Sequence, residues 1–286
     1  MSKEKMKYHE YNFLVRKEDE EEIIDYMMLI NYNDYFIERE VKNDNAVMKF
    51  YMSYKNPDEN ILKELMGIFN LEILSHEVVE EMDWLKAWMD TLQPFEFIEG
   101  IWVNPFPDKP LKDKKTVIDI IPGTAFGTGL HPTTRLAGEL LAVSDLSHKT
   151  VLDVGCGTAI LSMISKIFGA EKVLGIDYDI LAVEKAEETV ELNNQNIEIR
   201  HSDFLSALKN DEKFDIIVSN MVAEILVNLM SDEKFDTIMK EGTVVIFSGI
   251  MDGKEELVIN NASKHGLKEI KRMEDGSWRG LIFRKI

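Results

Sequence analysis

The sequence predicts a two-domain α/β protein. A doubly wound, mostly parallel sheet that ends in an antiparallel hairpin follows a small ferredoxin-like α+β domain. Three observations predict this fold. The stretch 149–160 joins an apolar run to a glycine turn and an amphipathic segment, which is typical of a buried strand, a tight turn and a helix start. Apolar runs and helical stretches alternate from there to the final residues. The first eighty residues instead follow the order β-α-β-β-α-β.

The first domain is expected over residues 1–80. Alternation and helical spacing predict its strands and helices, in order, at Tyr8–Val15, Asp19–Ile30, Tyr35–Glu40, Ala46–Ser53, Pro57–Phe69 and Leu71–Val79. The segment holds 10 basic and 18 acidic residues, a net charge of −8. It contains nothing that resembles a catalytic cluster. We interpret it as a substrate-recognition domain, with a purely structural appendage as the open alternative.

Residues 81–115 are expected to link the two domains, so that the second domain spans 116–286. The link contains a helical stretch at Asp83–Thr91, where Trp84 and Trp88 lie four residues apart and are expected to pack. A short strand is expected at Ile101–Val103. Three prolines between 105 and 110 then make the stretch that is typical of a domain edge.

A polar loop precedes the glycine turn. Val117–Ile121 is an expected strand, and the thirteen residues 122–134 that follow hold three glycines and four threonines, which suits gripping the polar ends of a small ligand. Thr133 or Thr134 is the expected N-cap of a helix over 135–143. His131 is a candidate base, although a single loop histidine more often has a structural role.

The second domain is expected to contain five strands with helical crossovers and a terminal hairpin. After the strand that begins at Thr150, the expected elements are Ile160–Phe168, Lys172–Asp177, Ile180–Asn193, Ile197–His201, Phe214–Asn220, Thr243–Ser248, Leu267–Arg272 and Trp278–Arg284. The hairpin makes one edge of the sheet antiparallel.

The composition is that of a soluble globular protein. The 286 residues are 45% hydrophobic and 30% charged, enough for two domains with full cores. We expect no membrane span, because no run of eighteen apolar residues exists, and no signal peptide, because no apolar region follows the charged start. Cys156 is the only cysteine, so no internal disulfide can form and the reducing cytoplasm is the expected compartment.

The formal net charge is −19, from 33 basic and 52 acidic residues. Such a chain repels phosphate backbones, and it has no cluster of Lys and Arg interleaved with aromatic residues. We therefore expect no direct nucleic-acid substrate, and a basic protein partner fits the charge better. Charge alone does not separate this interpretation from a surface that only serves solubility.

The glycine turn and the strand that follows it predict a cofactor site. Asp177 ends the second strand, where its carboxylate can accept hydrogen bonds from two ribose hydroxyls. The nicotinamide fingerprint G-x-G-x-x-G, begun at Gly155, puts its third glycine at Ile160, whose branched side chain prevents the close packing needed there. The turn around Gly157 therefore favours S-adenosylmethionine, whose methionine part needs no pyrophosphate cradle. Cys156 in this turn is interpreted as a small residue and not as a nucleophile.

These residues resemble the PrmA family, the methyltransferases of ribosomal protein L11. The resemblance covers nearly the whole chain. It is carried by Asp83-Trp84 with Trp88, Pro94, Trp102–Pro105, Gly123–Thr134, Val151–Ala159, Gly175–Asp179, Val218–Asn220, Ser248–Ile250 and the final hairpin. It implies a Rossmann-like seven-stranded methyltransferase sheet behind a substrate-recognition domain. Two departures stand out, namely Ala159 in place of a usual glycine, and Glu224 where small or apolar residues are usual beside the substrate pocket.

The resemblance also implies site residues. Carried over by motif position, the family's cofactor contacts fall on Thr134, Gly155, Asp177 and Asn220, and we assign Gly157, Phe126 and Asp203 to the same site. Asn220 is the expected catalytic residue, because its side-chain oxygen can accept a hydrogen bond from an amine and aim the lone pair. The alternative, that it only holds the cofactor, is equally open. No metal ion is expected.

The implied function is methyl transfer from S-adenosylmethionine to lysine amines, with an N-terminal amine as a further acceptor, of a basic ribosomal protein of the large-subunit stalk base. The departure at Glu224 leaves the substrate less certain than the chemistry. A methyltransferase that acts on another protein, on RNA or on a small molecule stays open as the alternative, as does a binding protein that kept the fold without its catalysis.

Overall fold

The computed structural model describes residues 7–29, 32, 35–39, 45–55, 57, 59–80, 92–121 and 129–286. The chain divides into two compact units, 1–92 and 93–286, and each is considered by itself below. The predicted helix Asp83–Thr91 lies outside the described residues. None of the described helices has the length and apolar character needed to cross a membrane.

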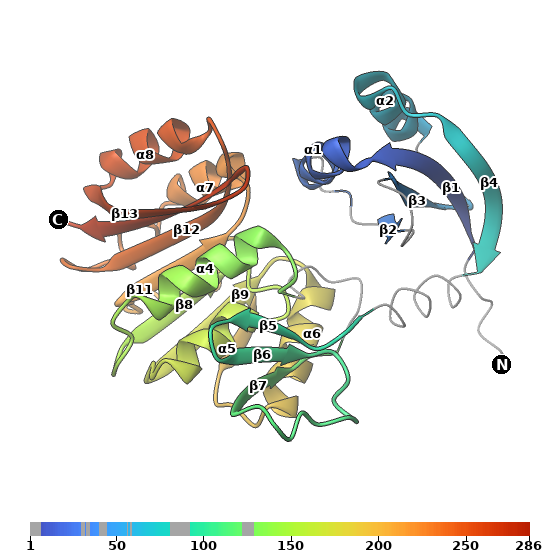
Figure 1. Ribbon diagram of the computed structural model, residues 1–286. Coiled ribbons are helices and arrows are strands. Elements are labelled where there is room, and N and C mark those ends of the chain that lie inside the picture. Colours follow the sequence, from blue (N-terminus) through green and yellow to red (C-terminus); the bar gives the residue numbers. More distant parts are fainter. Residues whose placement is uncertain are drawn as a thin grey trace. The chain divides into compact units, whose positions relative to one another are not determined.

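The first unit is a four-stranded antiparallel sheet packed on two helices (Figure 1). Its elements are β1 (Lys7–Arg16), α1 (Lys17–Leu29), β2 (Tyr35–Arg39), β3 (Asn45–Ser53), α2 (Glu59–Phe69) and β4 (Ile73–Glu80). The sheet order is β2-β3-β1-β4. Alternate residues of β1 and β3, such as Phe13, Met48 and Phe50, are fully buried against Ile23 and Leu65 of the helices. The predicted β-α-β-β-α-β order is confirmed in these described elements.

The second unit is built on a seven-stranded sheet with the order β10-β9-β8-β11-β12-β14-β13. The strands are β8 (Thr150–Val154), β9 (Lys172–Asp177), β10 (Glu198–His201), β11 (Ile216–Asn220), β12 (Val244–Met251), β13 (Leu267–Asp275) and β14 (Trp278–Lys285). The first five strands in this order are parallel, and β14 and β13 close one edge antiparallel. This is the doubly wound sheet with a terminal hairpin that the sequence predicts.

Helices cover both faces of this sheet. They are α4 (Pro132–Ala142), α5 (Ile160–Ile167), α6 (Ile180–Leu192), α7 (Ala223–Met230) and α8 (Glu255–Lys264). One core contains residues of α4, α5 and α6, and a second core contains residues of α7 and α8 (Figure 1). Adjacent strand residues alternate between the two cores, as Val151 and Leu152 of β8 do, because successive side chains point to opposite faces.

A small three-stranded sheet packs beside α4. It consists of β5 (Phe95–Ile98), β6 (Ile101–Asn104) and β7 (Thr116–Asp119). The strands expected at Ile101–Val103 and near Val117 are confirmed, whereas β5 is an element that the sequence did not indicate. Phe97 is buried and lies directly against Gly138, where a Cβ atom would come within 2.6 Å of its ring. The second unit therefore begins at Gln93, and part of the stretch expected to link the domains contributes strands to it.

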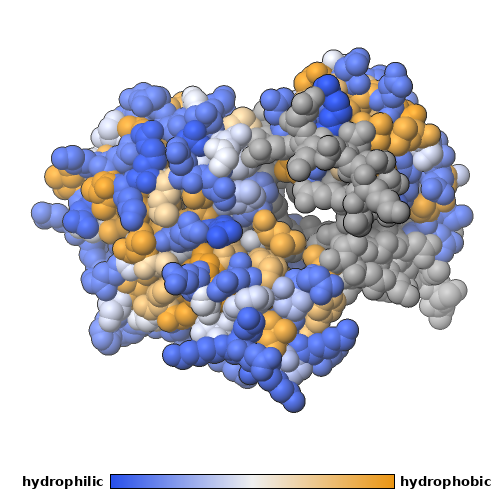
Figure 2. All heavy atoms as spheres, viewed as in Figure 1, coloured by the Kyte–Doolittle hydropathy of each residue, from blue (hydrophilic) through white to orange (hydrophobic). Residues whose placement is uncertain are grey.

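The surface carries the predicted excess of polar side chains. Hydrophilic residues cover much of the visible face of the second unit, with apolar side chains scattered among them (Figure 2). Figure 2 does not show the far face, but the composition of 52 acidic and 33 basic residues applies to the whole chain. The site therefore has to be located from backbone and side-chain geometry, because no single apolar patch on the visible face points to it.

Candidate functional site

The turn between β8 and α5 has an unusual backbone. Gly155, Gly157 and Ala159 all have positive φ angles, of 71°, 53° and 63°. Ala159 is the N-cap residue of α5 and provides no side-chain hydrogen bond to the helix. The amides of Gly155 and Cys156 both donate to the carbonyl of Ile176, at 2.9 and 3.0 Å. The turn therefore wraps over the end of β9 and leaves the first amides of α5 without a side-chain cap.

Asp177 ends β9 beside this turn. Its Oδ2 accepts a hydrogen bond from the Gly157 amide at 2.8 Å, and its Oδ1 accepts one from the Asp179 amide at 3.0 Å. Each carboxylate oxygen can accept more than one hydrogen bond. The half-buried side chain thus keeps acceptor capacity on both oxygens for the hydroxyl groups of a ligand.

Asn220 ends β11 on the other side of β8. Its Nδ2 donates to Oγ1 of the buried Thr134 in α4 at 3.1 Å, although 86 residues separate the two in sequence. Its Oδ1 is buried and has no hydrogen-bond partner. Most buried polar atoms in proteins are paired. An unpaired acceptor of this kind beside the glycine turn indicates a place where a ligand or substrate donates.

The backbone after Asn220 is held by two neighbouring segments. The Met221 amide donates to the Ser248 carbonyl at 3.1 Å, and Ser248 Oγ donates to the Thr133 carbonyl at 2.7 Å. The Met221 side chain lies over the glycine turn, where a Cβ on Gly155 would meet its sulfur at 3.1 Å. These contacts bring the ends of β8, β11 and β12 and the start of α4 together.

The strand register places the predicted residues in one row. His201 pairs with Asp177, Val154 with Ile176, and Ser219 with Val154, so the carboxyl ends of β10, β9, β8 and β11 lie side by side. The chain order reverses between β8 and β11, and in open α/β sheets ligands bind at this switch point. We call the carboxyl ends of these four strands the site edge.

Asp153 lies beneath the turn and is completely buried. Its Oδ2 accepts a hydrogen bond from Ser162 Oγ at 2.7 Å, and its Oδ1 has no partner. Burial raises the pKa of this carboxyl group to about 7. Burial, together with the nearby Asp153 and Asp177, also raises the pKa of the Cys156 thiol, so Cys156 is a protonated thiol and not a nucleophile.

His131 has a structural role at the start of α4. Its Nδ1 accepts a hydrogen bond from the Thr133 amide at 3.2 Å, and its ring packs edge-on against the Trp278 ring at 5.1 Å. Burial lowers the pKa of His131 to about 4, so the imidazole is neutral and available as the acceptor. The prediction that Thr133 or Thr134 is the N-cap is wrong. Pro132, which lacks an N–H and has a helical φ, occupies the first helical position, and this moves the cap to His131.

The comparisons with known proteins agree over nearly the whole chain. The model of the family described as ribosomal protein L11 methyltransferase (PrmA) matches residues 8–286. A ribosomal protein L11 methyltransferase of Thermosipho africanus is 37% identical over 278 residues, which are 97% of this chain and 98% of that protein. One of Thermotoga petrophila is 37% identical over 98% of this chain and all of that protein.

The chain belongs to the ribosomal protein L11 methyltransferase (PrmA) family. A solved structure agrees with this assignment. The ribosomal protein L11 methylase of Lactobacillus delbrueckii subsp. bulgaricus superimposes with a TM-score of 0.61 and 30% identity, over 68% of this chain and all of that chain. The resemblance that the sequence showed is thereby confirmed, as are the Rossmann-like methyltransferase fold and the methyltransferase class.

The structure brings together five of the residues that the sequence analysis assigned to the site of this PrmA-family chain, either by direct contact or through a neighbouring residue. These are Thr134, Gly155, Gly157, Asp177 and Asn220. Asp203 is exposed two residues beyond β10, where the neighbouring Ser202 amide donates to the Asp177 carbonyl at 2.8 Å. Phe126 lies outside the described residues.

Other residues of the site were missed from sequence. Met221 and Ser248 stand in stretches that the family resemblance had marked, but they were not assigned to the site, because the contacts that place them there join segments far apart in the chain. Asp153 did have a local signal, a single acid inside an apolar strand. Glu224, the departure from the family, lies exposed in the first turn of α7 and pairs with Lys254 at 3.0 Å. An acid is favoured at this end of a helix by the helix dipole.

Proposed function

We propose that this chain transfers methyl groups from S-adenosylmethionine to amines of ribosomal protein L11, to lysine side chains first and to the N-terminal amine as a further acceptor. The observation that carries the proposal is the buried, unpartnered Oδ1 of Asn220 beside the glycine turn and Asp177. It supports an amine-binding position next to a cofactor position. The chain's family membership supports the reaction and the kind of substrate.

The residues present fit S-adenosylmethionine. Asp177 keeps acceptor capacity for the two ribose hydroxyls. The absence of side chains at Gly155 and Gly157 suits a close approach of the methionine part to the backbone, once the flexible Met221 side chain, which lies over Gly155, moves aside. Asp203 follows Ser202, whose amide donates to the Asp177 carbonyl, and we place the adenine base of the cofactor beside Asp203. Thr134 holds Asn220 and borders the same space. Phe126 is assigned to this site by its place in the family motif.

When bound, the cofactor supplies a methyl group on a positively charged sulfur, which an amine lone pair can displace. A lysine with an ordinary pKa of about 10.4 must first lose its proton, which costs roughly 4.6 kcal/mol at pH 7. Burial of the amine disfavours the charged form and lowers this cost. Asn220 Oδ1 accepts a hydrogen bond from one of the two remaining N–H groups and fixes the direction of the lone pair. Positioning of this kind can supply about 7–11 kcal/mol of the barrier reduction.

The recognition of the substrate is assigned to the first part of the chain. We propose residues 1–80 as the recognition domain, 81–115 as the connecting stretch and 116–286 as the catalytic domain, with the part of the connecting stretch from Gln93 onward belonging to the same compact unit as the catalytic domain. The net charge of −8 over residues 1–80 suits a basic protein of the stalk base of the large ribosomal subunit and disfavours a direct contact with RNA. The reaction is placed in the cytoplasm, where this substrate is assembled.

Equilibrium binding tests the cofactor assignment. Asp177→Ala removes two charge-assisted hydrogen bonds to the ribose, and each is worth about 1.5–3 kcal/mol, so the Kd for S-adenosylmethionine should rise at least about 100-fold. Asp113→Ala, an exposed aspartate in the same unit and away from the site edge, is the control and should leave the Kd unchanged. An unchanged Kd in Asp177→Ala would refute the ribose assignment.

Methyl transfer tests the substrate and Asn220 together. Purified ribosomal protein L11 should accept label from methyl-labelled cofactor, and ribosomal RNA in the same reaction should not; label in the RNA alone would refute the proposal. Asn220→Ala should lower kcat with little change in the Kd of the cofactor. Asn220→Asp should lower kcat most at neutral pH, because a carboxylate keeps the amine protonated. If the Asn220 variants change only cofactor affinity, then Asn220 is a cofactor contact without a catalytic role.

A further inference from the structure

The connection between β10 and β11 is built differently from the other parallel crossovers. Within the described residues, α5 joins β8 to β9, α6 joins β9 to β10, and α7 lies between β11 and β12, but residues 202–215 contain only turns. This segment begins with Ser202 and Asp203 and therefore forms part of the site edge. Without a helix to pack on the sheet, its shape has to be fixed by other interactions.

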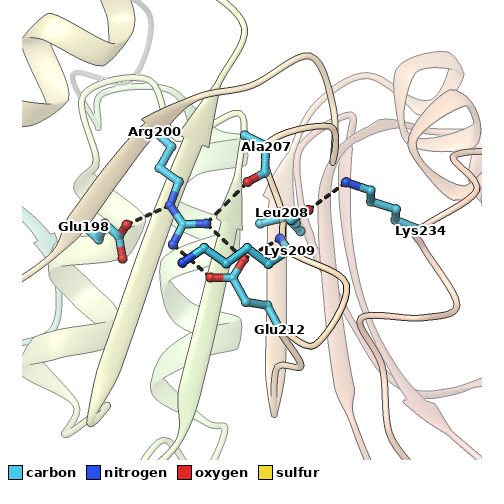
Figure 3. A network of polar contacts seen from close by, with 7 residues as sticks. All are labelled: Glu198, Arg200, Ala207, Leu208, Lys209, Glu212 and Lys234. Atoms are coloured by element: carbon cyan, nitrogen blue, oxygen red, sulfur yellow. Dashed lines mark hydrogen bonds and ion pairs between the residues drawn. The ribbon is translucent and has the colours of Figure 1, made fainter.

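Arg200 of β10 provides the main interaction that fixes the shape of this segment. Its Nη1 and Nη2 donate to the two carboxylate oxygens of Glu212, each at 2.9 Å, and its Nε donates to Glu198 at 2.7 Å (Figure 3). The parallel pair of bonds is the strong, geometrically specific arrangement of a guanidinium with a carboxylate. Arg200 and Glu212 lie 12 residues apart, so their bridge closes the intervening segment into a loop.

Backbone groups of the loop are bound to the same network. Glu212 Oε2 also accepts from the Lys209 amide at 2.9 Å, and Lys234 Nζ donates to the carbonyls of Ser206 and Leu208 at 2.9 and 2.6 Å (Figure 3 shows the bond to Leu208). Hydrogen bonds from Arg200 lower the pKa of Glu212, which keeps the carboxylate ionised. The bridge is thus maintained across the neutral pH range.

The end of the loop nearest the site is under strain. Phe204, directly after Asp203, has a φ of 41°, a left-handed conformation that a side chain other than glycine rarely adopts. Ser202 Oγ donates to the Phe204 carbonyl at 2.6 Å and accepts from the Ala207 amide at 3.1 Å. Strained backbone persists where the surroundings determine it strongly. Here the hydrogen bonds of Ser202 and the Arg200–Glu212 bridge hold the backbone of Phe204 in this conformation.

We propose that Arg200 is a positioning residue for the cofactor. It acts by holding the helix-free loop 202–213 in place, so that Asp203 and Phe204 pack against the adenine base of S-adenosylmethionine. The proposal rests on the assignment of S-adenosylmethionine to the site edge. Arg200 itself touches neither cofactor nor substrate in this role. Since both partners of the bridge are partly exposed, at 19% and 23%, its loss should affect the loop more than the whole fold.

The test compares Arg200→Met with a matched variant. The Kd of S-adenosylmethionine and that of 5′-methylthioadenosine, a probe that lacks the amino-acid end, should both rise about tenfold in Arg200→Met, which corresponds to about 1.4 kcal/mol. kcat at saturating cofactor and the KM for ribosomal protein L11 should stay unchanged. Arg272→Met removes another two-bond bridge, to Glu269 at 3.0 and 3.1 Å in the hairpin, and should leave both Kd values unchanged.

Two further variants separate positioning from a general structural role. The exchange Arg200→Glu with Glu212→Arg, made together with Glu198→Gln so that two carboxylates do not meet on β10, restores the bridge between the two ends of the loop and should recover part of the affinity. Arg200→Met combined with Asp203→Asn should lose little more affinity than Asp203→Asn alone, because both changes remove the same contact. Additive losses, or no recovery in the exchange variant, would overturn the proposal.

The outcome for Asp177→Ala distinguishes the role of Arg200 from the cofactor assignment. If Asp177→Ala weakens cofactor binding and Arg200→Met does not, the inference about Arg200 is wrong and the proposed function stands. If both variants bind the cofactor as the unmodified chain does, the cofactor assignment fails and the role of Arg200 fails with it.

Discussion

The site edge and the terminal hairpin belong to the same sheet but differ in how well their polar groups are satisfied. At the site edge, three of five consecutive residues from Gly155 to Ala159 have positive φ angles. In the described part of the second unit, the two buried side-chain atoms without a partner are Asp153 Oδ1 and Asn220 Oδ1, both at this edge. The hairpin β13–β14 is paired along its length with one irregularity after Glu269, and its turn uses a glycine.

The comparison shows that destabilising features of this protein, namely unpaired buried acceptors and left-handed backbone, occur at the site edge. Unpaired buried acceptors, and left-handed backbone at a residue other than glycine such as Ala159, each cost on the order of 1–3 kcal/mol. The hairpin and the two cores supply regular pairing and apolar burial that offset such costs. A ligand that donates hydrogen bonds to the unpaired acceptors at the site edge recovers part of this energy. Four changes test the contrast, beginning with the largest expected effect.

Gly249→Ala tests the tightest contact behind the site edge. Gly249 has a φ of 83°, and a Cβ there would lie 2.6 Å from the Met221 carbonyl oxygen. We expect a loss of about 3 kcal/mol or more in the free energy of unfolding, together with reduced activity, as the end of β11 is displaced. Gly253→Ala is the control, since its φ is 80° but nothing lies within 4 Å, and it should cost about 1–2 kcal/mol. Denaturant unfolding measures both variants. If Gly249→Ala and Gly253→Ala lost the same free energy of unfolding, the close contact between Gly249 and Met221 would be contradicted.

Asp153→Asn tests the raised pKa of the buried carboxyl group through the dependence of protein stability on pH. Its folded-state pKa of about 7 lies above its ordinary value of 3.8, so the folded state binds the proton more tightly than the unfolded chain. Its contribution to stability is present below pH 3.8 and is lost as the pH rises through about 7. The asparagine variant should therefore gain stability relative to the unmodified chain over this window, by up to about 1.4 kcal/mol per pH unit.

The measurement is urea unfolding of both proteins at a series of pH values between about 4 and 8, the window set by the two pKa values. The asparagine side chain can still accept the hydrogen bond from Ser162, so the comparison isolates the charge. Asp211→Asn, at an exposed position, is the control for the effect of the substitution itself. If the difference in unfolding free energy between Asp153→Asn and the unmodified chain did not vary with pH, ionisation of the Asp153 carboxyl group would not be disfavoured in the folded state.

His131→Ala tests the capped helix start that adjoins the site edge. Loss of the N-cap acceptor should reduce the free energy of unfolding by about 1 kcal/mol. His131→Asn keeps a side-chain acceptor and should lose less, and the kcat of both variants should be retained if the histidine is no base. A loss of turnover in His131→Asn with normal stability would restore the histidine as a catalytic candidate.

Ala159→Gly should give the smallest change. Glycine removes the left-handed strain at φ 63°, worth about 1–2 kcal/mol, but adds about 0.5–1 kcal/mol of chain entropy to the unfolded state. We expect a net effect within about 1 kcal/mol, on the stabilising side. Ala142→Gly at the end of α4 lacks the strain and should be destabilising; urea unfolding measures both variants. Equal destabilisation in the two variants would show that Ala159 is not strained.

Much of the fold could be predicted because its signals are local. Apolar alternation located the strands, and the glycine turn with its strand-end acid located Gly155, Gly157 and Asp177. The parallel order of the strands then follows from the short crossovers. Elements with weak patterns were missed. β5 is four residues long, and α7 and α8 follow strands without a helix signal that stood out from the sequence.

The sequence by itself determined the order of the elements, the family and the position of the glycine turn, since each depends on neighbouring residues and their spacing. Only the tertiary structure decided how distant segments meet. It paired Asn220 with Thr134 across 86 residues and left one oxygen of Asn220 free. It also buried Asp153 without a full set of partners and tied the loop after β10 to Arg200. Register and packing fix these contacts, and neither leaves a pattern in a short stretch of sequence.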